Sequence, residues 1–390
     1  MVEKLFKVIG APFQKGGLLE NYYPAYQAIE TIALTPGLVT KSGPHIRDAV
    51  DLKRFMIMVV FCITPCALFG IFNAGYQSLT YAGVESPGLL ACVAQGLYRF
   101  LPLYIITLVA GGSVEAIFSV VRKHEINEGF LVSSLLFPLI LPPTCPLWMA
   151  AIGIIFGVVI GKEVFGGTGM NIFNPAMTAR CFLFFAYPAQ MSGGLEVWVA
   201  PAIDFSSFSP LPYIDAISGA TPLMSAYNSE LAGNYEFWHM LIGLIPGCIG
   251  ETSALLALVG GIALVTMGIG SYKTMIGCVI GALATATLFT VLSPETAREL
   301  HTMSPFNHLV MGGFAFGAVF MATDPVSGPA TGMGKWIYGI LIGTLAVLIR
   351  NINPAYPEGM MLAILFMNLF APLIDHYVME ARIKRRLSRG

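Results

Sequence analysis

A threonine hydroxyl in a small-residue motif is the feature of this sequence best suited to carry chemistry. Residues 218–221 read Ser-Gly-Ala-Thr and Pro222 follows, so an uncrowded backbone presents a hydroxyl just before a residue that stiffens the chain. The pattern alone is common and is typical of a turn. Its position is less common, because it lies on a long polar stretch of an otherwise apolar chain. Thr221 is therefore a candidate functional residue.

Two asparagines form a second candidate site. They follow the glycine-rich stretch 166–169, and Asn171 and Asn174 are one turn apart on the same face of the helix expected to begin there. Amide side chains both donate and accept hydrogen bonds, which suits the edge of an uncharged ring. Capping of the helix by asparagine is the structural alternative. No Walker-type loop is present, so phosphate binding is not indicated.

Acidic residues in apolar segments are the third set of candidates. Gly111 and Gly112 precede Glu115 inside an apolar run, and the paired glycines leave room for a planar ligand. A carboxylate in such a run is costly to bury and is a functional candidate. The alternative is a helix-packing notch with Glu115 at the interface. Asp324 and Asp375 lie at or within later apolar runs, where a helix cap or an interface also explains an acid.

The elements that position these residues are predicted to be membrane helices. Apolar residues make up 56% of the 390 residues and charged residues only 11%, whereas a soluble domain carries roughly 25% charged residues. The net charge of −1 gives no reason to expect a nucleic-acid partner. The seven cysteines show no C-x-x-C pair, zinc spacing or haem motif, which indicates packing rather than a metal or haem site.

The long apolar runs predict an all-α membrane protein of about ten transmembrane helices. The apolar segment 237–248 is too short to cross and is expected to dip in as a half-helix. The tripeptide Asn-Pro-Ala occurs at 174–176 and 353–355, which suggests an inverted repeat. Spans are expected at 55–76, 97–121, 130–143, 147–161, 172–190, 251–269, 273–292, 307–322, 334–350 and 359–376.

The placement of Lys and Arg predicts the orientation. With these spans, the basic residues that flank the helices fall on one side, except Arg298 and Arg350, and the positive-inside rule assigns that side to the cytoplasm. The stretch 181–272 has no Lys or Arg, so its polar part is expected on the outer face. The predicted organisation is a cytoplasmic segment 1–54, a membrane half 55–190, an outer loop 191–236, a second membrane half 237–376 and a basic tail 377–390.

Several longer segments carry a resemblance to a known family. From about residue 20 to the end, and in colinear order, the chain is similar to the NqrB subunits of the Na⁺-translocating NADH:quinone oxidoreductases. One departure is Gln27 after Tyr26, where the family often has glutamate, and Glu30 lies one turn later. The segments that carry the resemblance are 35–41, 45–54, 122–130, 162–169, 218–221, 321–327 and 353–360.

The resemblance implies two flavins. The family's motif threonine carries FMN through a phosphoester bond, which requires a hydroxyl and is installed by a separate flavin transferase. A covalent tether would also keep a cofactor on a loop that is open to outside water. A second flavin, riboflavin, is held without a covalent bond by two asparagines. The matching residues are Ser218, Gly219, Ala220 and Thr221 for FMN, and Asn171 and Asn174 for riboflavin.

The resemblance also implies a quinone site and an ion path. Gly111, Gly112 and Glu115 match residues near the family's ubiquinone site, and Glu115, Asp324 and Asp375 match acids tied to Na⁺ uptake. Carboxylate oxygens suit a hard cation, and no metal beyond transient Na⁺ is expected.

The implied setting is a six-subunit complex of the bacterial inner membrane. Both termini would be cytoplasmic and the flavin loop periplasmic. Electrons would pass through FMN and riboflavin to ubiquinone, coupled to Na⁺ export. The chain lacks a dinucleotide fingerprint, so NADH oxidation is expected on a partner subunit.

Two alternatives remain open. The RnfD subunit of the related ferredoxin-dependent Rnf complex shares the Ser-Gly-Ala-Thr motif, but the N-terminal segments 35–41 and 45–54 and the glycine pair at 111–112 argue against it. A flavin-free channel or transporter of small solutes would also use many spans, broken helices and an inverted repeat.

Overall fold

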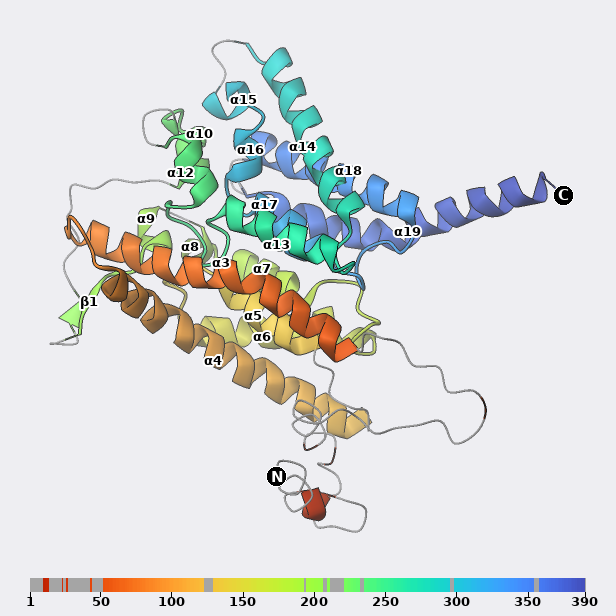
Figure 1. Cartoon of the computed structure of the whole chain (residues 1–390), viewed down its shortest axis with the longest axis horizontal. Coiled ribbons are helices and arrows are strands. Elements are labelled where there is room, and N and C mark those ends of the chain that lie inside the picture. Colours follow the sequence, from red (N-terminus) through yellow and green to blue (C-terminus); the bar gives the residue numbers. More distant parts are fainter. Residues whose placement is uncertain are drawn as a thin grey trace.

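The computed structural model describes most of the chain, and the described part is mostly helical (Figure 1). This confirms the all-α membrane fold predicted from the sequence. One short antiparallel strand pair is present among the described residues, β1 (Ile203–Asp204) with β2 (Ser209–Pro210). The described residues are 10–13, 23, 26, 43, 52–122, 129–192, 194–205, 209–210, 221–231, 235–294, 298–353 and 358–389.

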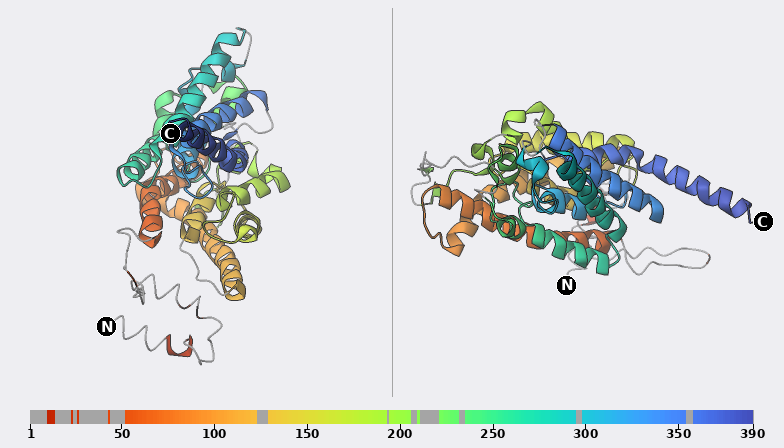
Figure 2. Two further views of the ribbon diagram at one scale, coloured as in Figure 1. Left: turned by 90° about the vertical axis from the view of Figure 1, so that its right-hand side faces the viewer. Right: turned by 90° about the horizontal axis from the view of Figure 1, so that it is seen from above.

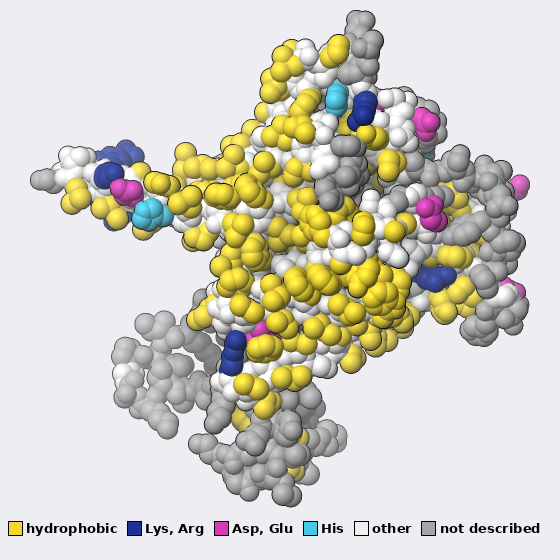
Figure 3. All heavy atoms as spheres, turned by 180° about the vertical axis from the view of Figure 1, so that it is seen from behind, with side chains coloured by type: hydrophobic (Ala, Val, Ile, Leu, Met, Phe, Trp, Pro, Cys, Tyr) yellow, Lys and Arg dark blue, Asp and Glu magenta, His cyan; other side chains and the backbone are white. Residues whose placement is uncertain are grey.

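Within those ranges, six helical segments are long and apolar enough to cross a membrane. Large apolar side chains such as Phe61, Leu90 and Val291 are exposed on this single chain. Figure 3 shows hydrophobic side chains over most of one face of the bundle, as expected for a surface that meets lipid or partner helices. The long helices are α3 (Leu52–Tyr81), α4 (Leu89–Arg122), α6 (Leu147–Gly161, extended by η3, Glu163–Phe165), α14 (Tyr272–Leu292), α18 (Gly332–Ile352) and α19 (Met360–Leu387).

The other four expected spans are shorter or broken. A proline follows the end of two of them, Pro142 after the first and Pro188 after the second, and the residue before a proline is biased away from helical geometry. The span expected at 307–322 is divided at Gly312, whose φ of 59° is left-handed. The elements at these positions are α5 (Gly129–Leu139), α7 (Pro175–Ala186), α13 (Ala254–Thr266), and the series α16 (Asn307–Val310), α17 (Phe314–Phe316) and the π-turn η4 (Gly317–Met321).

The half-helix expected before α13 is present in a shorter form. It is α12 (Phe237–Ile242), which ends at Gly243 with a φ of 101°, a conformation that glycine adopts without strain. A Cβ at Gly243 would lie 2.6 Å from the Ser253 backbone, so the chain turns back tightly here. The remaining described helices are η1 (Ala11–Phe13), α8 (Pro188–Met191), α9 (Leu195–Trp198), α10 (Pro222–Tyr227) and α15 (Glu299–Thr302).

Two irregular loops pair with each other inside the bundle. The Gly250 N–H donates to the Leu139 carbonyl at 2.7 Å. Asn73 on α3, which is 2% exposed, donates from Nδ2 to the Ile245 carbonyl at 2.9 Å. Because lipid offers no hydrogen bonds, irregular backbone inside the bundle needs such partners within the protein.

The inverted repeat suggested by the two Asn-Pro-Ala tripeptides stays a prediction.

Glycines bring α14 and α18 into close contact along their length (Figures 1 and 2). A Cβ at Gly281 would collide with the Ile340 carbonyl oxygen, and one at Gly343 with the Cys278 carbonyl oxygen. Gly277 and Gly281 on α14, and Gly339 and Gly343 on α18, are each four residues apart, and this spacing serves close helix packing.

The basic helix ends and the candidate loop lie at opposite ends of the bundle. In Figure 1 the C-terminal ends of α4 and α19 lie towards the right, while α8, α9, α10 and β1 lie towards the left. The end of α4 carries Arg122, and that of α19 carries Lys384, Arg385 and Arg386.

Gly281→Val is expected to destabilise the detergent-solubilised chain by roughly 1–3 kcal/mol, because the added side chain must push α18 away from α14. Thermal unfolding followed by intrinsic fluorescence measures the effect. The matched control is Ala284→Val on the exposed face of the same helix, which should leave the melting temperature unchanged. Equal melting temperatures for the two variants would contradict close packing at Gly281.

Candidate functional sites

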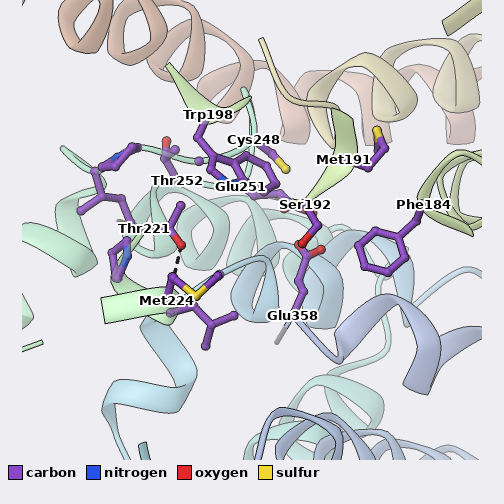
Figure 4. A pocket seen from close by; sticks show the side chains of 16 residues that line it. Phe184, Met191, Ser192, Trp198, Thr221, Met224, Cys248, Glu251, Thr252 and Glu358 are labelled. Atoms are coloured by element: carbon purple, nitrogen blue, oxygen red, sulfur yellow. Dashed lines mark hydrogen bonds between the residues drawn. The ribbon is translucent and has the colours of Figure 1, made fainter. Parts of the chain in front are cut away.

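Thr221 lines a cavity at the end of the bundle that carries α8, α9 and α10 (Figure 4). It is the N-cap of α10, and its Oγ1 accepts a hydrogen bond from the Met224 N–H at 3.4 Å. We call this the Thr221 cavity; the space within it that no atom fills, open solvent included, is about 710 Å³. The other lining residues are Phe184, Met191, Ser192, Trp198, Pro222, Leu223, Met224, Ile245, Pro246, Gly247, Cys248, Glu251, Thr252, Gly312 and Glu358.

A buried ionic cluster forms part of one wall of the Thr221 cavity: Cys248, Glu251 and Glu358 line the cavity, and Arg180 binds them from outside the lining. Arg180 on α7 donates from Nη1 to Glu251 at 2.9 Å and from Nη2 to Glu358 at 2.5 Å. The Cys248 Sγ lies 3.3 Å from the same Nη2. Arg180 is 3% exposed, so its charge depends on these carboxylates. Removing one partner of such a cluster is far more costly than breaking a surface pair.

The same cluster is the one place in the described chain where several metal-ligating side chains gather. Ligand atoms of Cys248, Glu251 and Glu358 lie within 4.8 Å of one another. Both carboxylates already bind the Arg180 guanidinium, so a cation would have to displace it.

Arg350 holds the neighbouring wall together. It is fully buried on α18 and donates to three carbonyls, those of His308 at 2.6 Å, Met311 at 2.9 Å and Glu358 at 3.2 Å. These bonds tie the broken segment α16–α17 to Glu358, which also binds Arg180. The cavity wall is therefore fixed by charge-assisted hydrogen bonds rather than by regular helix.

Asn171 and Asn174 line a second cavity, where α3, α5, α7, α13 and the end of η4 meet. We call it the asparagine cavity; the space within it that no atom fills, open solvent included, is about 770 Å³. Asn174 caps α7, with Oδ1 accepting from the N–H groups of Ala176 at 3.0 Å and Met177 at 3.3 Å. Asn171 donates from Nδ2 to the Phe173 carbonyl at 2.9 Å. The capping alternative thus holds for Asn174, and both side chains still face a cavity.

Asp324 lies in the wall of the asparagine cavity. Its carboxylate accepts from Ser327 Oγ at 2.8 Å and from the Val326 N–H at 3.1 Å, and it also accepts a hydrogen bond from the Asn174 side chain. Burial raises the pKa of Asp324, and these hydrogen bonds oppose the rise. The structure therefore brings two separately predicted sites, the asparagines and this acid, into one cavity.

Glu115 reaches the edge of the asparagine cavity through an ion pair. Its buried carboxylate binds the ammonium of Lys162, and Lys162 lines the cavity. Nearby on α4, a Cβ at Gly111 would lie 2.5 Å from the Phe130 ring, so this glycine serves packing. Gly112 has more room, since its Cβ would meet only the Phe130 ring, at 3.5 Å.

Asp375 has a structural role in the described chain. Its carboxylate accepts from the Ala330 N–H at 2.6 Å and the Thr331 N–H at 3.1 Å, and also from the Thr331 hydroxyl. These bonds tie α19 to the turn that begins α18. Asp375 lines neither cavity. Ser218, Gly219 and Ala220, and also Gln27 and Glu30, lie outside the described residues.

Sequence reasoning named Asp324 but missed Arg180, Glu251 and Glu358 at the Thr221 cavity and the role of Lys162 at the asparagine cavity. Arg180 stands inside an expected span, and an ionisable residue there is a functional candidate by default, so its position was a usable signal. Lys162 served only as a marker of orientation. Glu251 and Glu358 lie at segment edges, where acids are common, and only the fold shows that both face Arg180.

The fold and its two cavities define a multi-pass helical membrane protein with buried charges facing internal sites. The chain belongs to the NQR2, RnfD, RnfE family, whose model matches residues 39–384. It is 49% identical to the NqrB subunit of the Na(+)-translocating NADH-quinone reductase of Stutzerimonas stutzeri, over 97% of this chain and 96% of the relative. It is 48% identical to the corresponding subunit of Klebsiella pneumoniae (strain 342) over the whole of both chains. The corresponding subunit of Chromohalobacter salexigens is 47% identical over 97% of this chain and 94% of the relative.

Arg180→Gln is expected to destabilise the chain by about 3–5 kcal/mol, because Glu251 and Glu358 would stay buried without their cation. Thermal unfolding in detergent measures the loss. The triple change Arg180→Gln/Glu251→Gln/Glu358→Gln should recover most of it by removing all three charges. Lys384→Gln, which breaks an exposed pair with Glu380, should have no effect. A melting temperature of Arg180→Gln equal to that of the wild type would contradict this account.

Proposed function

We propose that this chain is the flavin-carrying NqrB membrane subunit of a Na⁺-translocating NADH:ubiquinone reductase. In this proposal it passes electrons to ubiquinone, and the transfer is coupled to Na⁺ export. The relatives that carry this name match at 47–49% identity over nearly their whole length, which supports the assignment. The observation that carries the chemical part is the Thr221 hydroxyl in the wall of a cavity. NADH oxidation would take place on a partner subunit.

The Thr221 cavity fits a tethered FMN. The aromatic side chains of Trp198 and Phe184 line it and suit a planar ring. Thr252, also in its wall, has a buried hydroxyl without a hydrogen-bond partner among the described residues, which leaves it available to a ligand. FMN bound there would supply redox chemistry. The role of the chain is to anchor the phosphate through Thr221, orient the ring and exclude water from it.

The asparagine cavity fits the uncharged riboflavin. Asn171 Oδ1 and the remaining amide groups offer donors and acceptors to a ring edge, and no phosphate-binding loop is needed for a flavin that lacks phosphate. One helix joins the two proposed flavin sites, because Asn174 caps α7 and Phe184 near its other end lines the Thr221 cavity. Ten residues of helix separate them, which is about 15 Å along the axis.

The quinone site is proposed beside Gly112 on α4. This glycine is half-buried, and its neighbour Ser113 is exposed on the outer surface of the bundle. A quinone dissolved in the bilayer could approach the helix from that side. Gly111 would contribute by letting Phe130 pack against α4 and shape the notch.

The ion path is proposed to use Glu115, Asp324 and Asp375. The first two are linked to the asparagine cavity, one through Lys162 and one directly. Their oxygens suit Na⁺, which would replace a present partner: the Lys162 ammonium at Glu115 or a hydrogen-bond donor at Asp324. At Asp375 it would replace donors of the 330–331 turn.

The proposed setting is the bacterial inner membrane, with both termini cytoplasmic and the Thr221 loop periplasmic. The proposed partners are the other subunits of a six-subunit complex, ubiquinone, and a flavin transferase that reads residues 218–221. The RnfD subunit of an Rnf complex is the second candidate, supported by membership of the shared family. The near full-length match to NqrB relatives favours the first. A flavin-free transporter is separated from both by the next test.

Thr221→Ala is expected to abolish covalent flavin, because alanine has no hydroxyl to form the phosphoester. The chain is co-expressed with its flavin transferase and run on a denaturing gel, where only covalently bound flavin fluoresces. Thr252→Ala, which removes a hydroxyl from the same cavity, is the matched control and should stay fluorescent. Fluorescence that persists in Thr221→Ala would reject this residue, and a dark wild-type band would favour the flavin-free transporter.

Asn174→Ser is expected to lower bound riboflavin severalfold while leaving α7 intact, because serine caps a helix but offers no amide. Asn171→Leu should act in the same way from the other side of the cavity. Riboflavin is extracted with denaturant from the purified complex and measured against protein by chromatography. Asn73→Ser, which changes a buried asparagine outside both cavities, should retain the flavin. Normal riboflavin content in both cavity variants would remove this cavity as the site.

A further inference from the structure

Lys162 places an unusual charge in the wall of the asparagine cavity. It follows α6, and it is only 5% exposed. Lysine is almost never buried to this degree without a partner. Its partner is Glu115, which reaches it from α4. Lys162 is among the residues that line the cavity, whereas Glu115 is not. The cavity therefore faces the positive end of this ion pair, and the negative end stands behind it.

The Lys162–Glu115 ion pair does more than join α4 to the segment that follows α6. Arg122 at the end of α4 and Glu163, the neighbour of Lys162, already join the same two segments, with Nη1 3.3 Å from Oε2. That second pair lines neither cavity. Of the two pairs, only Lys162–Glu115 presents a charge to the asparagine cavity. An ion pair that only joined the two segments would not need to place its ammonium in the cavity wall.

We propose that Lys162 sets the reduction potential of the flavin in the asparagine cavity, with Glu115 as the counter-charge that limits its effect. This inference rests on the proposed riboflavin site. Reduction adds negative charge to a flavin ring, and a nearby cation in a poorly solvated cavity favours the reduced form. Asp324 in the same wall acts in the opposite direction. Lys162 therefore acts on the flavin through its charge.

The order of reduction potentials among the wild type and four variants tests this placement of charge. Lys162→Gln removes the positive end and should lower the midpoint potential. Glu115→Gln releases the ammonium from its counter-charge and should raise it. The double change Lys162→Gln/Glu115→Gln keeps the net charge, yet it should lie below the wild type, because the lost cation is the nearer of the two charges to the cavity. Lys162→Arg should restore the potential in part.

The measurement is a spectroelectrochemical titration of the purified full chain with Thr221→Ala, so that only non-covalent flavin remains. Riboflavin content is measured on the same samples. Lys162→Gln should shift the ratio of affinities for reduced and oxidised riboflavin by about tenfold or more, which is about 30 mV for a two-electron couple. The matched control is Arg122→Gln/Glu163→Gln, which removes the neighbouring pair between the same segments and should leave the potential unchanged.

The outcomes separate the inference from the proposed function. Riboflavin bound at the wild-type potential in both Lys162→Gln and the double variant would overturn the role of Lys162 and leave the site standing. If Lys162→Gln does not fold, the charge-neutral double variant and Glu115→Gln still decide the order. Absence of riboflavin from the wild-type cavity would overturn the proposed site and this inference together.

Discussion

A charge can remain inside an apolar bundle only with a partner, and this constraint organises both cavities. Arg180 binds Glu251 and Glu358 behind the Thr221 cavity, and Lys162 binds Glu115 beside the asparagine cavity. In a medium of low dielectric constant, such pairs hold their side chains in place because separation is costly. They also leave fixed charges facing the cavities, where a bound ring would experience them strongly.

The broken helices follow from the same constraint. Backbone that leaves helical geometry inside the bundle needs hydrogen-bond partners from the protein. The loops after α5 and before α13 bond to each other, and Arg350 bonds to the carbonyls exposed around α16 and α17. The irregular segments form the cavity walls as a result, while long helices such as α14 and α18 provide the frame. Helix α7, which Asn174 caps and which carries Arg180, connects the two cavities.

The sequence was sufficient to predict the fold class but not the pairing of charges. Apolar runs predicted the long helices, because both the length and the hydrophobicity of a span are local properties; which helices the glycines bring together became visible only in the fold. The expected spans 130–143 and 172–190 ran past the ends of α5 and α7, because those ends depend on loops that meet across the bundle as well as on the prolines nearby. The contact of Asp324 with Asn174 could not be predicted, because 150 residues of chain separate them and only the fold joins them.

A density map of the assembled complex, at a resolution that shows planar rings, tests the central claim most directly. Density for a planar ring, joined through a phosphate to Thr221 Oγ1, is expected in the first cavity. A second, unattached ring is expected between Asn171 and Lys162. Side chains or lipid filling both cavities, with no planar density in either, would contradict this claim.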